Sequence, residues 1–206
     1  MYLNPKHTQV YYFWMATVNP TKPRMQRRDW LNAALAALVE GGIKAIAIER
    51  LAENLGLTRG SFYHHFKDRQ DLLQELLNYW EQRWTVEIGI EITALGLDPR
   101  QSLLALVRMI RHRKAAQYDT VFRSWALHDA MAREVVKRVD EYRLGVIRDL
   151  FERAGFEGLD AENRARLLLY YEAAEPTLFA KQNRETRDQL VEYRLKLLTA
   201  EGPDSD

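Results

Sequence analysis

Residues 47–73 read AIERLAENLGLTRGSFYHHFKDRQDLL, and this stretch determines the fold predicted for the amino-terminal part of the chain. The apolar spacing predicts a short helix over residues 48–55, and Gly56 ends it because glycine adopts the positive φ that a tight turn demands. A second helix is expected over residues 59–66, with the hydroxyl of Thr58 as its N-cap. Two short helices joined by a tight glycine turn predict a helix-turn-helix unit.

The second predicted helix has two distinct faces. At about 100° per residue, Phe62 and Phe66 lie close together, and we expect both rings to be buried. The opposite face is polar and basic, and its small first residues let the backbone approach base edges in a DNA major groove. A solvated helix with incidental histidines is the plainer alternative. The residues expected on the polar face and its flanks are Arg59, Gly60, Ser61, Tyr63, His64, His65 and Lys67.

The adjacent histidines do not predict a metal site. Neighbouring helical residues diverge by about 100°, so His64 and His65 cannot bind one ion together, and no carboxylate or thiolate completes a ligand set. The chain has no cysteine, which excludes disulfides, thiolate zinc sites and iron–sulfur clusters. We therefore expect no metal, no cofactor and no catalytic residue. A chain without cysteine also fits a reducing compartment, and we expect a cytoplasmic protein.

The quoted stretch resembles the DNA-binding signature of the TetR family of transcriptional regulators. The resemblance covers about residues 25–75 and includes the ending tyrosine–any residue–histidine–phenylalanine, here Tyr63 to Phe66, followed by lysine. Members usually carry Ser or Thr as the cap of the first of the two helices, where this chain has Ala47, so the cap itself offers no phosphate contact and Arg50 is the side chain that could replace it. The resemblance implies DNA contacts from Thr58, Arg59, Gly60, Ser61, Tyr63, His64, His65, Lys67 and Arg69.

The resemblance also implies an all-α fold of about nine helices, with a three-helix DNA-binding domain followed by a larger helical domain. We divide the chain into an extension or basic arm (1–24), the helix-turn-helix domain (25–70), and an effector-binding and dimerisation domain (71–206). Strand-like alternation is absent beyond the first twenty residues. Helical spacing predicts the remaining helices over residues 25–40, from 68 onward, and over 100–115, 119–127, 130–154, 161–180 and 185–199.

Charge is distributed unevenly along the chain, although the net charge is only +1. Residues 19–70 carry nine Lys/Arg against five Asp/Glu, a net +4, whereas residues 71–206 carry 20 against 24, a net −4. A basic front on an acidic body indicates different partners for the two parts. In the arm, Lys22 and Arg24 either reach the DNA backbone or minor groove, or belong to a solvated linker.

The apolar run VYYFWMATV (10–18) is too short to span a membrane and lacks the basic flank of a signal peptide. We interpret it as an extension, or as sequence upstream of a start at Met15 or Met25. No other segment reaches the length of a membrane span, so no membrane partner is expected.

The last two helices are the candidates for homodimerisation, as the resemblance also implies. One short recognition helix buries too little surface to be specific alone, so such proteins pair on palindromic DNA sites. Residues 165–180 are apolar nearly all round, and Leu190, Tyr193, Leu197 and Leu198 form a stripe on the final helix. The alternative is that both helices only close the core of a monomer.

A small-molecule effector, hydrophobic or aromatic, is expected in the body. Aromatic side chains with a few polar anchors suit such a ligand, although each is also a plausible core residue. Glu172 is the most specific of the candidates, because it is an acid within an otherwise apolar helix. The candidate pocket residues are Trp84, Met109, Phe122, Trp125, Tyr170, Tyr171 and Glu172.

These observations predict a ligand-responsive transcriptional regulator, a repressor, that binds a pseudo-palindromic operator as a homodimer and is not an enzyme. Two alternatives remain. His112 and the pair His128–Asp129 resemble part of the ligand set of HD-type metal phosphohydrolases, but the further His and Asp ligands of that family are missing. The other alternative is an architectural DNA-binding protein without an effector, for which so large an acidic domain is unexpected.

Overall fold

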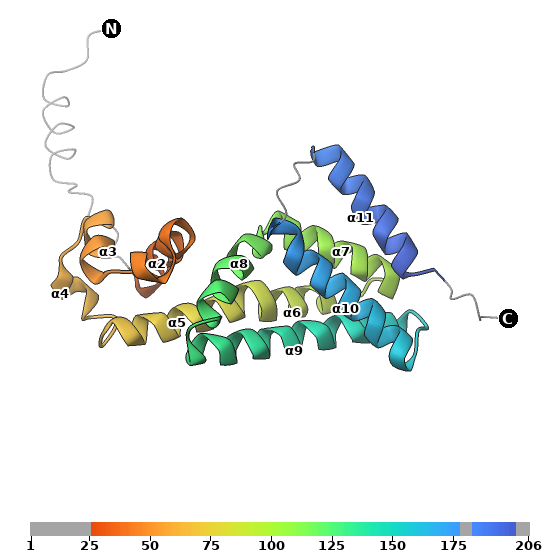
Figure 1. Ribbon diagram of the computed structural model, residues 1–206, viewed down its shortest axis with the longest axis horizontal. Coiled ribbons are helices and arrows are strands. Elements are labelled where there is room, and N and C mark those ends of the chain that lie inside the picture. The colour runs from red at the N-terminus through yellow and green to blue at the C-terminus, as the bar shows by residue number, and fades with distance from the viewer. Residues whose placement is uncertain (1–25, 178–182, 201–206) are drawn as a thin grey trace, which may run out of the picture.

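The computed structural model describes residues 26–177 and 183–200, and every regular element within them is a helix. The predicted arm (1–24) lies outside these residues. Three helices gather at one end of an elongated molecule (Figure 1), and the others form the body. Those of the end domain are α2 (Arg27–Gly41), α3 (Ile48–Asn54) and α4 (Arg59–Phe62), with the 3-10 turn η1 (Ile43–Ala45) between α2 and α3.

A continuous helix connects the end domain to the body. It consists of α5 (Arg69–Glu81), the π-helical turn η2 (Gln82–Val86) and α6 (Glu87–Ala94). Counted as one helix, this segment brings the described residues to nine α-helices, which confirms the all-α prediction. The other helices of the body are α7 (Pro99–His112), α8 (Ala115–Ala126), α9 (Ala130–Arg153), α10 (Gly158–Ala174) and α11 (Arg184–Leu198), with the 3-10 turn η3 (Glu175–Thr177) after α10.

The turn between α3 and α4 forms as the sequence predicts. Gly56 has a φ of +64°, and the Leu57 amide donates to the Ala52 carbonyl at 2.8 Å. Thr58 caps α4, since its hydroxyl accepts from the Ser61 amide at 3.3 Å. Phe62 is fully buried against α2, where its ring meets Trp30 edge to face with centroids 5.4 Å apart.

The predicted helix over residues 59–66 is too long, because α4 ends at Phe62. The His65 amide turns back to the Phe62 carbonyl at 2.9 Å, three residues away, which tightens the chain into a turn. Asp68 then caps α5 by accepting from the Asp71 amide at 2.9 Å, and Asp71 accepts in return from the Lys67 amide at 2.9 Å. This reciprocal cap at α5 takes up the residues that would have extended α4.

The other predicted helices agree with the structure to within a few residues, apart from two ends. The helix predicted over 119–127 begins earlier, at Ala115, and the helix predicted over 161–180 ends at Ala174. Side-chain caps account for the starts of α7, α9 and α11, where the side chains of Asp98, Asp129 and Asn183 accept from amides of the first turn.

Two apolar cores lie along the molecule. The first joins α2–α5 to α8 and the start of α9, and it includes Trp30, Phe62 and Trp80, all fully buried. The second joins α6 and α7 to the end of α9, α10 and α11. The first core continues across the predicted boundary at residue 70, so the end domain is packed directly onto the body. Helix α9 lies beside the α5–α6 helix along much of the body (Figure 1).

Candidate nucleic-acid interface and interior cavity

Burial of Phe62 and Phe66 leaves the opposite side of the α4 segment open to solvent. Tyr63 is 51% exposed although it is a large aromatic residue. Isolated exposed apolar residues are common, but here the tyrosine stands among polar and basic neighbours. Of the residues predicted to contact DNA, Thr58, Arg59, Gly60, Tyr63, His64 and Lys67 are exposed, and Ser61, His65 and Arg69 are half-buried.

Arg59 forms an ion pair within the end domain. Its Nε lies 3.2 Å from a carboxylate oxygen of Glu49 on α3, and both side chains are exposed. An exposed ion pair of this kind contributes only about 0–1 kcal/mol to stability. Arg59 could therefore leave Glu49 and bind a DNA phosphate at little cost in free energy. Ala47 is the N-cap of α3 and provides no side-chain cap. The consequence for a phosphate contact there remains a prediction.

Arg69 has a structural role that the sequence did not reveal. Its Nε donates to the Ile46 carbonyl at 2.7 Å, and its NH2 donates to the Ile43 carbonyl at 2.8 Å. The half-buried guanidinium thereby ties the start of α5 to the turn between α2 and α3. A DNA contact from Arg69 remains a prediction, and these two bonds leave fewer of its five N–H donors for it.

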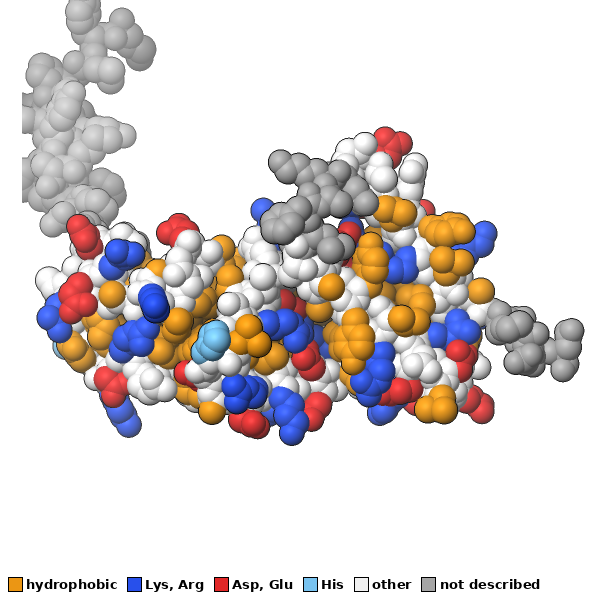
Figure 2. Space-filling model, in the orientation of Figure 1, with side chains coloured by type: hydrophobic (Ala, Val, Ile, Leu, Met, Phe, Trp, Pro, Cys, Tyr) orange, Lys and Arg blue, Asp and Glu red, His pale blue; other side chains and the backbone are white. Residues whose placement is uncertain are grey.

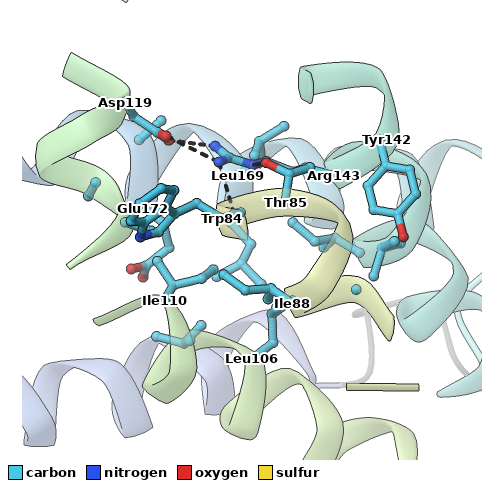
Figure 3. Close-up of a pocket in the computed structure, with 18 residues that line it drawn as sticks. Trp84, Thr85, Ile88, Leu106, Ile110, Asp119, Tyr142, Arg143, Leu169 and Glu172 are labelled. Carbon is cyan, nitrogen blue, oxygen red and sulfur yellow. Dashed lines mark hydrogen bonds and ion pairs between the residues drawn. The ribbon is translucent and has the colours of Figure 1, made fainter. Parts of the chain in front are cut away.

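The body contains an interior cavity of about 50 Å³ between α6, the π-helical turn and helices α7–α10. Aliphatic side chains such as Ile88, Leu106 and Ile110 line one side, and Asp119 and Arg143 lie on the opposite side (Figure 3). The cavity is far smaller than the roughly 300–1,000 Å³ of typical ligand sites. A ligand larger than a few water molecules therefore requires the lining to move.

A buried ion pair holds the π-helical turn at this cavity (Figure 3). The guanidinium of Arg143 on α9 meets both carboxylate oxygens of Asp119 on α8, at 2.5 and 3.1 Å, and both side chains are buried or nearly so. Its remaining donors reach the turn, with Nε at 3.0 Å from the Thr85 hydroxyl and NH2 at 3.2 Å from the Trp84 carbonyl. One arginine thus connects α8 and α9 to the helix that leads to the end domain.

Glu172 on α10 is a second buried charge at the cavity. Its carboxylate lies 2.7 Å from NH2 of Arg194 on α11 and 3.6 Å from Nε of Arg111 on α7. Burial raises the pKa of Glu172, and the two arginines oppose this rise only in part. Arg111 also binds Glu175 in the turn after α10. Because Arg194 belongs to α11, its bond to Glu172 connects the cavity to that helix.

Only two of the seven predicted pocket residues line the cavity, namely Trp84 and Glu172. Phe122 and Trp125 pack in the first core, where Phe122 stacks on Trp80 with centroids 4.4 Å apart. Met109 packs against the second core, and Tyr170 and Tyr171 are exposed on α10. Aromatic rings that stack on one another are satisfied without a ligand, so Phe122 and Trp125 have a structural role in the core. Effector binding by the seven residues remains a prediction.

Asp119 and Arg143 were not predicted from the sequence, although their positions in the helical pattern indicate that both face the core. Asp119 follows Ala115 by four residues and precedes Phe122 by three, so it stands on the buried stripe of α8. Arg143 likewise stands four residues from both Val139 and Ile147 on the buried stripe of α9. A charge at a core position of an amphipathic helix requires a partner, and two such charges on neighbouring helices predict their pairing.

The predicted stripe on the final helix divides between two faces. Leu190, Tyr193 and Leu197 are exposed, whereas Leu198 packs against the second core beside the buried Val191 and Leu195. On α10, Leu167 and Tyr170 are also exposed. Hydrophobic side chains gather over α10 and α11 in the space-filling view (Figure 2).

The residues of the phosphohydrolase alternative form no metal site. His112 and His128 are exposed, and Asp129 caps α9 by accepting from the Ala132 amide at 2.9 Å. Within residues 26–177 and 183–200, no group of three or more His, Cys, Asp or Glu side chains is placed to hold a metal ion. None of the helices in these same residues is long and apolar enough to cross a membrane.

Comparisons with known proteins agree with this geometry. Residues 31–76 match the family described as bacterial regulatory proteins, tetR family. The transcriptional repressor KstR2 of Mycolicibacterium smegmatis is 33% identical over 105 residues, 49% of this chain and 51% of that protein. The transcriptional repressor AcnR of Corynebacterium glutamicum is 29% identical over 129 residues, 60% of this chain and 68% of that protein. The matched stretch thus spans about half the length of the first of these relatives.

Solved structures share the fold over most of the chain. A transcriptional regulator of the TerR/AcrR family from Aquifex aeolicus superposes with a TM-score of 0.67 at 16% identity, covering 84% of this chain and 98% of that one. The ketosteroid transcriptional regulator KstR2 of Mycobacterium tuberculosis gives a TM-score of 0.59 at 19% identity, covering 85% and 93%. The amino-terminal residues 31–76 therefore match the tetR family, and the chain as a whole shares the fold of these regulators.

Proposed function

We propose that the protein is a DNA-binding transcriptional regulator, a repressor, that binds a pseudo-palindromic operator as a homodimer and responds to a small-molecule effector. The observation that carries this proposal is the exposed polar and basic edge opposite the buried rings of Phe62 and Phe66. An edge that combines small, aromatic and basic residues suits a major groove. The family of the amino-terminal domain supports the same conclusion.

The proposed DNA contacts divide into two kinds. Lys67 and Arg59 meet phosphates, because an exposed cation beside the recognition segment gains by releasing counterions from the duplex. Tyr63 and His64 lie between them and reach the base edges or the sugar–phosphate backbone of the groove. Gly60 and Ser61 allow the backbone to come close to the DNA.

Homodimerisation is proposed through α10 and α11. Leu167 on α10 and Tyr193 on α11 are 60% and 62% exposed in the single chain, and such gathered apolar surface marks an interface. A two-fold pair presents two recognition segments about one duplex turn apart, or a little more, which matches a pseudo-palindrome. The alternative that both helices only close the monomer core leaves these exposed side chains without an explanation.

The proposed effector is hydrophobic and enters the interior cavity, since aliphatic side chains dominate the lining. Trp84 and Thr85 line this cavity and also belong to the π-helical turn, within the helix that continues into the end domain. A ligand that expands the cavity would shift this turn and change the spacing of the two recognition segments. It regulates DNA binding only if its affinity differs between the two conformations.

The assignment as a repressor rests on the names of the similar proteins, since KstR2 and AcnR are both described as transcriptional repressors. An architectural DNA-binding protein without an effector is distinguished by one result. Release of the DNA by a small hydrophobic molecule supports the regulator, and insensitivity to a broad set of such molecules supports the architectural role.

The test begins with selection of bound fragments from a random DNA pool, which yields the half-site and its symmetry. Mobility shifts on the selected operator then compare Tyr63→Ala and Lys67→Ala with the control Lys137→Ala, an exposed lysine on α9. Loss of a phosphate or base contact is expected to cost about 1–3 kcal/mol for each of the first two variants, with unchanged folding and dimerisation. Normal operator binding by both variants would mean that the wrong segment has been assigned to the DNA.

A further inference from the structure

A second hollow, separate from the interior cavity, lies between the end domain and the body. This groove has a volume of about 450 Å³ and opens to solvent. Helix α2 forms one wall, and residues of α5, the π-helical turn and α8 form the other. Among its residues are Arg28, Asn32, Tyr79, Arg83, Trp84 and Tyr118.

Three aromatic rings form an apolar surface in the groove. Trp84 meets Tyr79 edge to face with centroids 5.8 Å apart, and it meets Tyr118 at 4.5 Å. The tryptophan is buried beneath them, whereas both tyrosines are half-buried and keep ring surface free. The Tyr79 hydroxyl donates to the Asn32 side chain at 3.0 Å, which fixes its ring across the joint between α5 and α2. Such fixed rings offer a stacking surface to a planar apolar group.

Two arginines give the groove a positive charge. Arg28 comes from α2 and Arg83 from the π-helical turn, so the two cations approach from different walls. The Arg83 guanidinium lies 5.6 Å from the centre of the Trp84 ring, and among the described residues neither arginine forms an ion pair with a carboxylate. Glu40 is the single acidic residue of the lining. Unpaired guanidinium groups bind carboxylates through paired N–H donors.

We propose that this groove binds a planar aromatic anion, with its ring on the two tyrosines and its carboxylate between Arg28 and Arg83. The site goes beyond the proposed effector cavity, because it lies at the joint between the end domain and the body. Trp84 lines both the groove and the cavity, so the two sites share a wall. The claim is one of direct binding and does not depend on whether the chain binds DNA.

The test is calorimetric titration of the full chain with 2-naphthoate, compared with its neutral analogue 2-naphthamide. The double variant Arg28→Gln/Arg83→Gln is expected to raise the Kd of 2-naphthoate by about tenfold or more, because two charge-assisted contacts are lost. It should leave the Kd of the neutral amide nearly unchanged. The control Arg108→Gln/Arg148→Gln removes the same charge from exposed arginines of the body and should leave both values unchanged.

Two results would overturn the proposal. One is a Kd for 2-naphthoate that is the same in the wild type and in the groove variant. The other concerns Ala173→Leu, which narrows the interior cavity and leaves the groove unchanged. The proposal fails if this variant raises the Kd of 2-naphthoate as much as the groove variant does, or more. Either result would show that the aromatic anion does not bind between α2 and the body.

Discussion

Replacing Arg143 by Met is expected to destabilise the protein strongly, because it leaves the carboxylate of Asp119 buried without a partner. Asp119 is only about 4% exposed, and removal of one member of a buried pair costs about 3–5 kcal/mol. The Thr85 hydroxyl and the Trp84 carbonyl also lose their donor. For a chain of this size, such a cost corresponds to a fall in Tm of roughly 10 °C.

The double variant Arg143→Met/Asp119→Leu distinguishes the cost of an unpaired buried carboxylate from the cost of altered packing. Replacing a buried ion pair by apolar residues is often close to neutral, so the double variant should be more stable than the single variant by about 2 kcal/mol or more. The assay is urea unfolding followed by circular dichroism at one fixed protein concentration, since association adds to apparent stability. The control is Arg138→Met on the same helix, where the more exposed pair with the half-buried Glu81 should cost about 1 kcal/mol.

A destabilisation by Arg143→Met no larger than that of the Arg138 control would mean that Asp119 is not left buried without a partner. Equally, if the free-energy costs of Arg143→Met and Asp119→Leu simply add in the double variant, the two charges do not depend on each other.

The free energy of unfolding should depend on pH through Glu172, whose pKa burial raises above the ordinary value of about 4.3. The proton adds stability below the unfolded-state pKa, and this contribution is lost as pH rises through the folded-state pKa. The stability of Glu172→Gln relative to wild type should therefore increase as pH rises above about 4. Urea unfolding between pH 4 and 8 measures this difference, and the opposite trend would contradict a raised pKa for Glu172. Separately, Leu167→Glu and Tyr193→Glu place a carboxylate on the proposed dimer face and should each yield monomers in sedimentation equilibrium that bind the operator weakly. The control Leu127→Glu, at an exposed site after α8, should remain dimeric, and dimeric masses for the first two variants would reject this face.

The helix-turn-helix could be predicted from sequence because its determinants are local. The positive φ of Gly56, the Thr58 cap and the burial of Phe62 and Phe66 each follow from residue type and helical spacing within twenty residues. The same local reasoning extended the second helix to residue 66, whereas α4 ends at Phe62. It did not weigh the reciprocal cap of Asp68 and Asp71, which starts α5 and leaves only a turn before it.

The cavity was harder to predict because its lining comes from the π-helical turn, α6 and four further helices, α7–α10, that are spread along the sequence. Aromatic residues were chosen as candidates, yet Phe122 and Trp125 satisfy one another in the core. The charged members, Asp119 and Arg143, are visible in sequence only as polar residues on apolar stripes, and their pairing depends on how α8 packs on α9. The interior position of Glu172 was indicated by its apolar surroundings, but its arginine partners were not.

The most direct test of the central claim places a DNA-cleaving group on the recognition edge. The chain has no cysteine, so His64→Cys gives a single site for an iron–EDTA reagent, and Leu159→Cys, 81% exposed on α10, serves as the control. The label at position 64 should cleave the selected operator at two symmetric positions about one duplex turn apart, or a little more, and the label at position 159 should not cleave it. If the label at position 159 cleaves the bound operator and the label at position 64 does not, the α4 segment does not face the DNA.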